Sequence, residues 1–97
     1  MLLLNLSPRA LEDLERLREF LAKEDPVGAD ATADLIIGAV EVLTRHPLIG
    51  RPAEDNLREL LISRGRSGYI ALYDYSPDTN RVVIRAVRHQ REAGFEE

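Results

Sequence analysis

The stretch GYIALYDYSPDTNRVVIRAVRH, residues 68–89, decides the fold of this chain. Two apolar runs, 68–75 and 81–89, enclose the turn-forming residues SPDTN. Each run alternates with the period of a β-strand, so we predict an antiparallel hairpin. In the first strand we expect one face to carry Tyr69, Ala71, Tyr73 and Tyr75, and the other Ile70, Leu72 and Asp74. In the second strand we expect Val82, Ile84 and Ala86 on one face, and Val83, Arg85 and Val87 on the other.

Two further strands are predicted around this hairpin. The run LRELLIS, residues 57–63, precedes it and is joined to it by RGRSG, a connection rich in turn formers. Short connections make these three strands an antiparallel meander. Residues 2–6 at the start of the chain form another short apolar run, and PLIGRPAEDN, residues 47–56, is predicted as an irregular loop.

The first helix is predicted directly after the opening strand. Ser7 is a favoured N-cap residue and Pro8 suits the first helical turn. Apolar residues then recur at helical spacing until the helix is expected to end near Asp25 and Pro26. They are Ala10, Leu14, Leu17 and Leu21.

A second helix is predicted from about Val27 to Arg45, because Pro47 disfavours helical backbone at the residue before it. Gly38 in its middle costs roughly 1 kcal/mol relative to alanine, unless close packing uses the missing side chain. The short turn between the helices makes them an antiparallel hairpin.

The element order β-α-α-β-β-β predicts the α+β class. We expect a helix hairpin packed on one face of a mainly antiparallel four-stranded sheet. The length of 97 residues suits one domain, 1–97. Exposed positions should include Glu15 and Glu19, and the mostly buried ones are expected to be Leu14, Leu17, Leu21, Ile37 and Val40.

The charges are unevenly distributed along the chain. Residues 1–44 carry four Lys/Arg and nine Asp/Glu, a balance of −5, whereas residues 45–91 carry nine arginines and five Asp/Glu, a balance of +4. Arginine offers a planar fork of donors that suits carboxylates and phosphates. The basic half therefore indicates either a partner with negative groups or an ordinary solvated surface.

Several classes of site are excluded or disfavoured. The absence of cysteine excludes disulfides and cysteine-ligated zinc, and it is compatible with the cytoplasmic location that we expect. The opening MLLLNLS is far shorter than the ~20 apolar residues that span a bilayer, so no membrane segment is predicted. His46 and His89 are distant in sequence and make a poor zinc site. We expect neither a metal nor a cofactor.

Three segments, in this order, resemble the RelE/ParE family of small bacterial toxins from type II toxin–antitoxin modules. LSPRALEDLERLREFLA (6–22) resembles the opening strand and helix of the family, and LTRHPLIGRP (43–52) resembles its Pro-x-x-Gly-Arg loop. YIALYDYSPDTNRVVIRAVRHQR (69–91) resembles the central hairpin and the basic last strand. The resemblance covers about residues 3 to 92, and it implies a toxin that a small antitoxin, encoded beside it, holds inactive.

The family divides by mechanism. RelE-like members cut messenger RNA on the ribosome, whereas ParE-like members have no known nuclease chemistry and poison DNA gyrase. The nucleases tend to keep an arginine three residues before the tyrosine of the third strand, and here Ile70 precedes Tyr73 by three. Near the C-terminus, where a tyrosine or histidine often completes the nuclease site, this chain has Phe95. Both departures favour the ParE-like branch, with gyrase as the partner and no direct contact with nucleic acid.

Two groups of candidate residues follow from the resemblance and the basic strand end. The expected antitoxin-binding residues are Arg58, Arg64 and Arg66, and the expected target-binding residues are Arg85, Arg88, His89 and Arg91. No catalytic residue is assigned, although His89 could transfer a proton in a nuclease. The three tyrosines could stack on bases or pack in the core. The alternatives are a ribosome-dependent mRNA endonuclease and an inactive relic that only binds the antitoxin.

Overall fold

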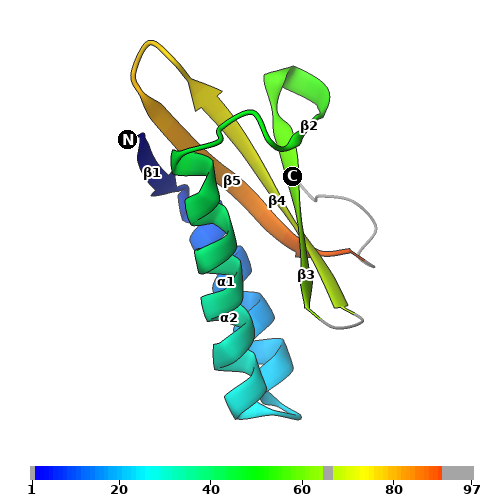
Figure 1. Cartoon of the computed structure of the whole chain (residues 1–97). Coiled ribbons are helices and arrows are strands. Elements are labelled where there is room, and N and C mark those ends of the chain that lie inside the picture. Colours follow the sequence, from blue (N-terminus) through cyan, green and yellow to red (C-terminus); the bar gives the residue numbers. More distant parts are fainter. Residues whose placement is uncertain (1, 65–66, 91–97) are drawn as a thin grey trace.

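The computed structural model describes residues 2–64 and 67–90, and Figure 1 shows their arrangement. The strands are β1 (Leu3–Leu6), β2 (Arg51–Pro52), β3 (Arg58–Arg64), β4 (Ser67–Ser76) and β5 (Arg81–His89). They form one sheet in the order β1-β5-β4-β3-β2, in which β1 is parallel to β5 and the other neighbours are antiparallel. The predicted α+β architecture is confirmed. The sheet has five strands instead of four, because two residues of the predicted loop, Arg51 and Pro52, pair with Glu59 and Arg58.

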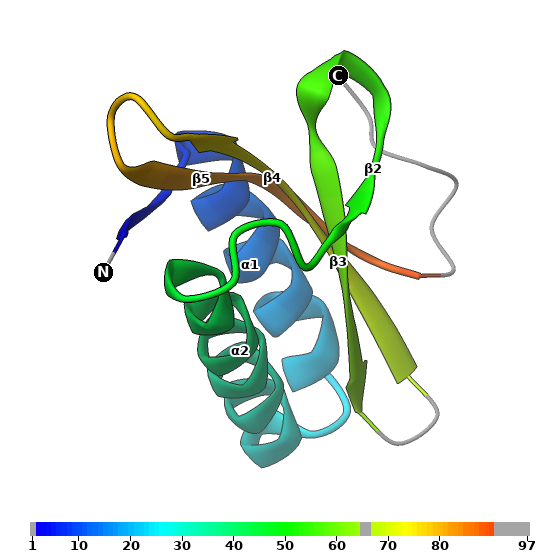
Figure 2. The same cartoon turned by 45° about the horizontal axis from the view of Figure 1, so that its top comes forward.

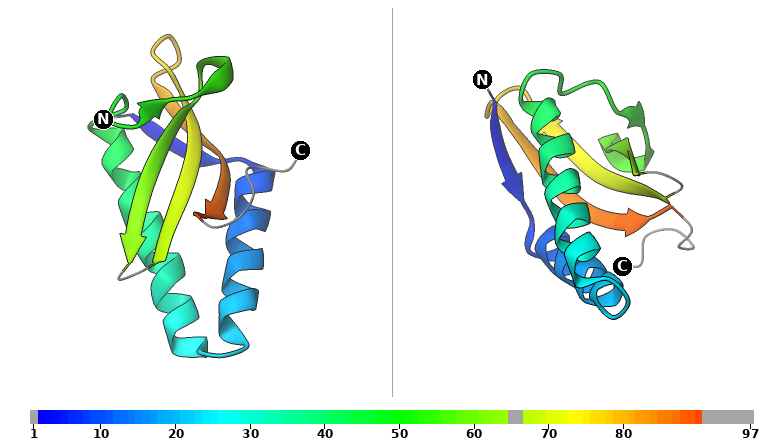
Figure 3. Two further views of the ribbon diagram at one scale, coloured as in Figure 1. Left: turned by 90° about the vertical axis from the view of Figure 1, so that its right-hand side faces the viewer. Right: turned by 60° about the horizontal axis from the view of Figure 1, so that its bottom comes forward.

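Both helices begin at residues whose side chains cap them. Helix α1 (Pro8–Ala22) is capped by Ser7, whose Oγ accepts a hydrogen bond from the Ala10 N–H at 3.1 Å. Helix α2 (Pro26–Val40) is capped by Asp25 in the same way, through the Gly28 N–H at 3.0 Å. The last turn of the second predicted helix is a separate 3-10 helix, η1 (Glu41–Thr44). The helices lie side by side on one face of the sheet (Figure 2), and the end where they join extends beyond it (Figure 3).

The core lies between the helix pair and the inner face of the sheet. Leu14, Leu17 and Val40 are buried as predicted, while Glu15 and Glu19 are exposed. The prediction for Ile37 is wrong, because its side chain is 43% exposed and Ile36 takes the core position at 1%. Consecutive helical residues point about 100° apart, so only one of two adjacent isoleucines can face the sheet. The other main core residues are Leu43, Ile62, Tyr69, Ala71, Tyr73, Val82, Ile84 and Val87.

A β-bulge in β5 changes which residues share a face. Leu72 pairs with Ala86, but the next residue, Tyr73, pairs with Ile84, so Arg85 is an extra residue in the ladder. The prediction for Arg85 holds, but the predicted alternation is wrong from Ala86 onward. Val87 joins the core face, and Ala86 lies with Arg85 on the outer face. One inserted residue reverses the facing of every residue that follows it.

Two glycines offer a matched test of this packing. A Cβ added at Gly38 would meet nothing within 4 Å, whereas one added at Gly50 would lie 2.6 Å from the Tyr73 hydroxyl and 2.8 Å from the Glu59 carbonyl oxygen. We predict that Gly38→Ala raises the free energy of unfolding by about 0.5–1 kcal/mol through helix propensity. Gly50→Ala should lower it by about 1–3 kcal/mol through overpacking. Urea denaturation measures both, and equal effects of the two substitutions would contradict the packing described for Gly38 and Gly50.

Candidate functional site

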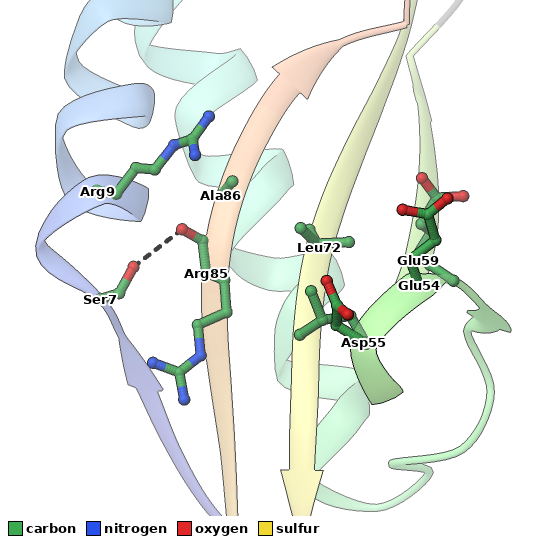
Figure 4. A pocket seen from close by; sticks show the side chains of 10 residues that line it. Ser7, Arg9, Glu54, Asp55, Glu59, Leu72, Arg85 and Ala86 are labelled. Carbon is green, nitrogen blue, oxygen red and sulfur yellow. Dashed lines mark hydrogen bonds between the residues drawn. The ribbon is translucent and has the colours of Figure 1, made fainter. Parts of the chain in front are cut away.

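An open groove of about 870 Å³ runs across the outer face of the sheet, opposite the helices. Its floor includes Leu72 of β4 and Ala86 of β5. Figure 4 shows Arg9, Ser7 and Arg85 on one side of this floor, and Glu54, Asp55 and Glu59 on the other. The groove therefore has a basic wall and an acidic wall on either side of an apolar strip.

The basic wall is fixed where β1 ends and α1 begins. The Ser7 N–H donates to the Ile84 carbonyl at 2.8 Å, and the Ser7 hydroxyl donates to the Arg85 carbonyl at 3.0 Å. One turn into the helix, the Asp13 carboxylate accepts the Val87 N–H at 2.9 Å. β1 pairs with β5 only as far as Ile84. Beyond that residue, Ser7 and Asp13 form the hydrogen bonds with the β5 backbone that a longer β1 would have formed. The bulge then turns Arg85 outward, where its guanidinium pairs with Asp74.

The acidic wall is carried by a tight curl of the chain, η2 (Glu54–Asn56). Asp55 and Asn56 have positive φ angles of 58° and 61°, a left-handed conformation that these residue types adopt more easily than most. The curl is closed by the Ala53 N–H, which donates to the Leu57 carbonyl at 2.8 Å. Glu59 in β3 completes the wall and forms an ion pair with Arg51 at 3.0 Å.

The loop that leads into β2 is held from inside by Tyr73. The Tyr73 side chain is fully buried, and its hydroxyl donates to the Pro47 carbonyl at 2.8 Å and accepts the Gly50 N–H at 2.9 Å. Arg58 also holds this loop, because its guanidinium donates hydrogen bonds to the carbonyls of Leu48 and Gly50, at 3.2 and 2.7 Å. Burial raises the pKa of the Tyr73 hydroxyl above its usual value of 10.0, although the Gly50 hydrogen bond and Arg58 act in the opposite direction.

The structure separates the predicted target-binding residues. Arg85 lines the groove, and Arg88 pairs with Ile70 further along the same face, where its guanidinium donates to the carbonyls of His89 and Gln90. His89 pairs with Tyr69 and lies on the helix side of the sheet, with the two rings edge to face at 5.2 Å. Arg91 and Phe95 lie outside the described residues.

Of the three predicted antitoxin-binding arginines, the structure describes Arg58 in full and the backbone of Arg64. Arg58 begins β3 and holds the loop described above. The backbone of Arg64 ends the strand, but its side chain lies outside the described part of the chain, as does all of Arg66. Ile70, which stands where the nucleases tend to keep an arginine, is 3% exposed.

The residues that line the groove carry charges of both signs on separate walls. None of its lining residues is a histidine or tyrosine, and three carboxylates on one wall oppose the approach of a phosphate. Across residues 2–64 and 67–90, no group of three or more His, Cys, Asp or Glu is arranged to hold a metal ion. Within the same residues, no helix is long and apolar enough to cross a membrane.

The fold and the groove define a small α+β protein of the kind found in toxin–antitoxin modules. A family model described as ParE toxin of type II toxin-antitoxin system, parDE, matches residues 4–94. Toxin RelE3 of Caulobacter vibrioides is 42% identical over 87 residues, which cover 90% of this chain and 92% of that protein. Toxin RelE1 of the same organism is 36% identical over 67 residues, covering 69% and 72%. This chain belongs to the RelE/ParE family of type II toxin–antitoxin toxins.

Solved structures share the fold at lower sequence identity. The chromosomal ParDE toxin–antitoxin system of P. aeruginosa contains a chain with a TM-score of 0.77 and 20% identity, which covers 92% of this chain and 96% of that one. The RelBE2 complex of Mycobacterium tuberculosis gives 0.61 and 24%, covering 94% and 93%. The E. coli RelBE complex gives 0.62 and 15%, covering 95% and 100%.

Replacing Tyr73 tests the interior support of the loop. We predict that Tyr73→Phe lowers the free energy of unfolding by about 1–3 kcal/mol, because it leaves the Gly50 N–H and the Pro47 carbonyl without their buried partner. The half-buried Tyr75 in the same strand provides the matched control. Tyr75→Phe should cost clearly less in the same urea titration.

The raised pKa of Tyr73 gives the same substitution a pH signature. In the unfolded chain a tyrosine ionises near pH 10, while in the folded protein Tyr73 stays neutral to higher pH. Its contribution is therefore complete below about pH 10 and is lost as the pH rises through the raised value. As the pH rises above about 10, wild-type stability should fall more steeply than that of Tyr73→Phe. Identical slopes would contradict this assignment.

Proposed function

We propose that this toxin acts by binding DNA gyrase, as ParE-like members do, and does not cleave RNA. The observation that carries the proposal is that the groove has charges of both signs: Arg9 and Arg85 lie on one side of its apolar floor, and Glu54 and Asp55 on the other. A phosphate backbone would meet repulsion from the acidic wall, whereas a protein surface can supply both signs of charge. The position of His89, on the other face of the sheet against Tyr69, also supports binding over acid–base chemistry at the groove. Gyrase itself is suggested by the match to the ParE toxin model.

The proposed contacts with gyrase are made by Arg85 and Arg88, with His89 and Arg91 as the remaining members of the set. Arg85 and Arg88 lie on one face of β5 and can meet one acidic surface together. Arg85 reaches solvent beside Asp74, and Arg88 is partly exposed. The two alternatives to gyrase binding are an mRNA endonuclease that acts on the ribosome and an inactive relic that only binds the antitoxin. The experiments below distinguish these three hypotheses.

The gyrase proposal predicts the order of events after induction. Replication should stop and the DNA-damage response should rise before translation falls, and purified toxin should trap gyrase on cut DNA while ribosome-bound mRNA stays intact. The double variant Arg85→Ala, Arg88→Ala should weaken gyrase trapping by about 10-fold or more. For each of the single variants Arg85→Ala and Arg88→Ala, the matched control is Arg18→Ala, which removes one arginine from the helix side, where it is paired with Glu15 and Asp30.

His89→Gln separates binding from catalysis. A binding role predicts a small effect, whereas the loss of a general acid or base typically costs ~100- to 10,000-fold in rate. If His89→Gln abolishes toxicity in a folded protein, and wild-type induction stops translation before replication, the nuclease hypothesis replaces the gyrase hypothesis. If induction arrests neither replication nor translation, the relic reading is correct.

A cognate antitoxin is the second proposed partner, and the edge of β3 is its proposed docking edge. β2 pairs with β3 only at Arg58 and Glu59, and in the described part of the chain no strand covers that side of Leu60, Leu61 and Ile62. An uncovered apolar edge is suited to the addition of a partner strand. The similar folds in ParDE and RelBE complexes support such a partner. Acidic antitoxin residues are proposed to meet Arg58, Arg64 and Arg66.

We predict that the antitoxin encoded beside the toxin raises its thermal stability. Binding at about 100 times the dissociation constant stabilises the folded state by roughly 2.7 kcal/mol. Leu61→Lys, at a side chain that is 53% exposed on the β3 edge, should reduce this shift. Leu11→Lys places the same charge at a 56% exposed position of α1 and should not reduce it. An unchanged melting temperature of the wild type at saturating antitoxin would contradict antitoxin binding.

A further inference from the structure

Helix α2 is apolar on its outer side as well as on its core side. Its inner face buries Ala29, Thr32, Ile36 and Val40. An outer stripe at helical spacing is exposed and also carries no charge; it consists of Val27, Ala31, Leu35 and Gly38, and continues to Val42 in η1. A helix on the surface of a soluble protein normally has a polar outer face. An outer stripe that is apolar throughout is suited to a partner, and Val27 at 81% exposure shows how much of it this chain leaves uncovered.

Gly38 gives this stripe a point of close approach. Glycine in a helix interior is unfavourable, and here, apart from its two chain neighbours and the nearby backbone of its own helix, no atom lies within 4 Å of where its Cβ would be. No packing within the described chain therefore uses the missing side chain. Leu35 and Val42 stand on either side of it along the stripe, at 37% and 43% exposure. The stripe thus has a shallow notch between two aliphatic side chains, which can receive a large side chain or the backbone of a second helix.

A row of carboxylates borders the stripe on one flank. Asp30, Asp34 and Glu41 are exposed and follow one another at helical spacing beside it. Asp30 pairs with Arg18 of α1 at 3.4 Å, which places this row on the α1 side of the stripe. The exposed positions of α2 include no lysine or arginine. The surface therefore selects a helix with an apolar face and a basic flank.

A second copy of this chain does not meet that requirement. Two α2 helices packed antiparallel about a two-fold axis would place both acidic rows on the same side of their contact. A parallel pair would avoid this, but it would align the two helix macrodipoles unfavourably. Neither arrangement supplies cations to Asp34 and Glu41.

The opposite flank of the stripe leads to the proposed antitoxin edge. Helix α1 lies over β5, whereas α2 contacts β3. The flank of α2 away from α1 therefore lies on the β3 side of the molecule, as the left panel of Figure 3 shows. One continuous partner chain can cover the β3 edge and the outer face of α2. It would meet arginines at β3 and carboxylates at α2.

We infer that the antitoxin carries, next to the segment that covers β3, an amphipathic helix with a basic flank that packs on α2 across Gly38. This inference rests on the proposed antitoxin partner and deepens it. The antitoxin segment is acidic where it meets β3 and basic where it meets α2. The stripe from Val27 to Val42 is about 22 Å long at the helical rise, which matches a partner helix of roughly 15 residues.

Two toxin variants test the inference in the purified complex. Gly38→Leu fills the notch and should weaken antitoxin binding by about 10-fold or more, while the toxin alone stays folded because the new side chain points into open space. The double variant Asp34→Lys, Glu41→Lys should also weaken binding, more strongly at low salt than at high salt. The matched control is Glu12→Lys, Glu19→Lys, which makes the same charge change at two exposed positions of α1 and should leave the affinity unchanged.

Zero-length carbodiimide cross-linking of the wild-type complex identifies the neighbours directly. The expected products join Asp34 or Glu41 of the toxin to lysines of the antitoxin, mapped by mass spectrometry. If the wild type binds antitoxin but both variants bind equally well and no such cross-link forms, this inference fails and the antitoxin proposal stands. If the wild type itself does not bind, the antitoxin proposal fails. Variants that lose only self-association, or only gyrase trapping, would assign the α2 face to a second copy or to the target, and would also overturn the inference.

Discussion

The buried hydroxyl of Tyr73 is the interaction on which the functional side of this molecule depends. It lies at the centre of the sheet, yet it bonds to Pro47 and Gly50, more than twenty residues earlier in the chain. An aromatic residue on the core face of a strand would normally contribute packing alone. Here its polar end also satisfies a loop that crosses from the helices to the sheet edge, where a backbone carbonyl and N–H would otherwise be buried without partners. The position of β2, and through it the acidic wall of the groove, follows from that bond.

A second constraint acts at the opposite edge of the sheet. β1 covers β5 only as far as Ile84, and the bulge at Arg85 begins at that point. Ser7 and Asp13 then supply hydrogen-bonding groups to β5 that a longer β1 would have supplied. The helix can take over from the strand because the bulge turns the β5 backbone, and the same bulge sends Arg85 into the groove. The single bulge at Arg85 therefore both lets Ser7 and Asp13 cover the exposed edge of β5 and places Arg85, a candidate binding residue, on the outer face.

The sequence contains most of the local information for this fold. Ser7 and Pro8 predict the start of α1, and the alternation in residues 68–75 predicts β4, because caps and periodicity depend only on near neighbours. The bulge at Arg85 and the two-residue strand at Arg51 leave no periodic signal and depend on contacts distant in sequence. The error at Ile37 has a similar origin, since two adjacent isoleucines fit the helical pattern equally well until the sheet selects one.

The candidate site was predictable in composition and only partly in geometry. Arginine enrichment after residue 44 indicated a basic surface, and Arg85 does line the groove. A charge count along the chain cannot show that Glu54, Asp55 and Glu59, which belong to the same basic half, lie on the opposite side of the groove. On the helix side, the acidic half of the chain likewise has a feature that a charge count misses, namely the apolar stripe along α2. The outer face of the sheet thus has carboxylates beside its arginines, and the outer face of α2 has an apolar stripe beside its carboxylates. A partner attracted by charge alone would fit neither face, because matching both requires a chain whose own charge and hydrophobicity change along its length.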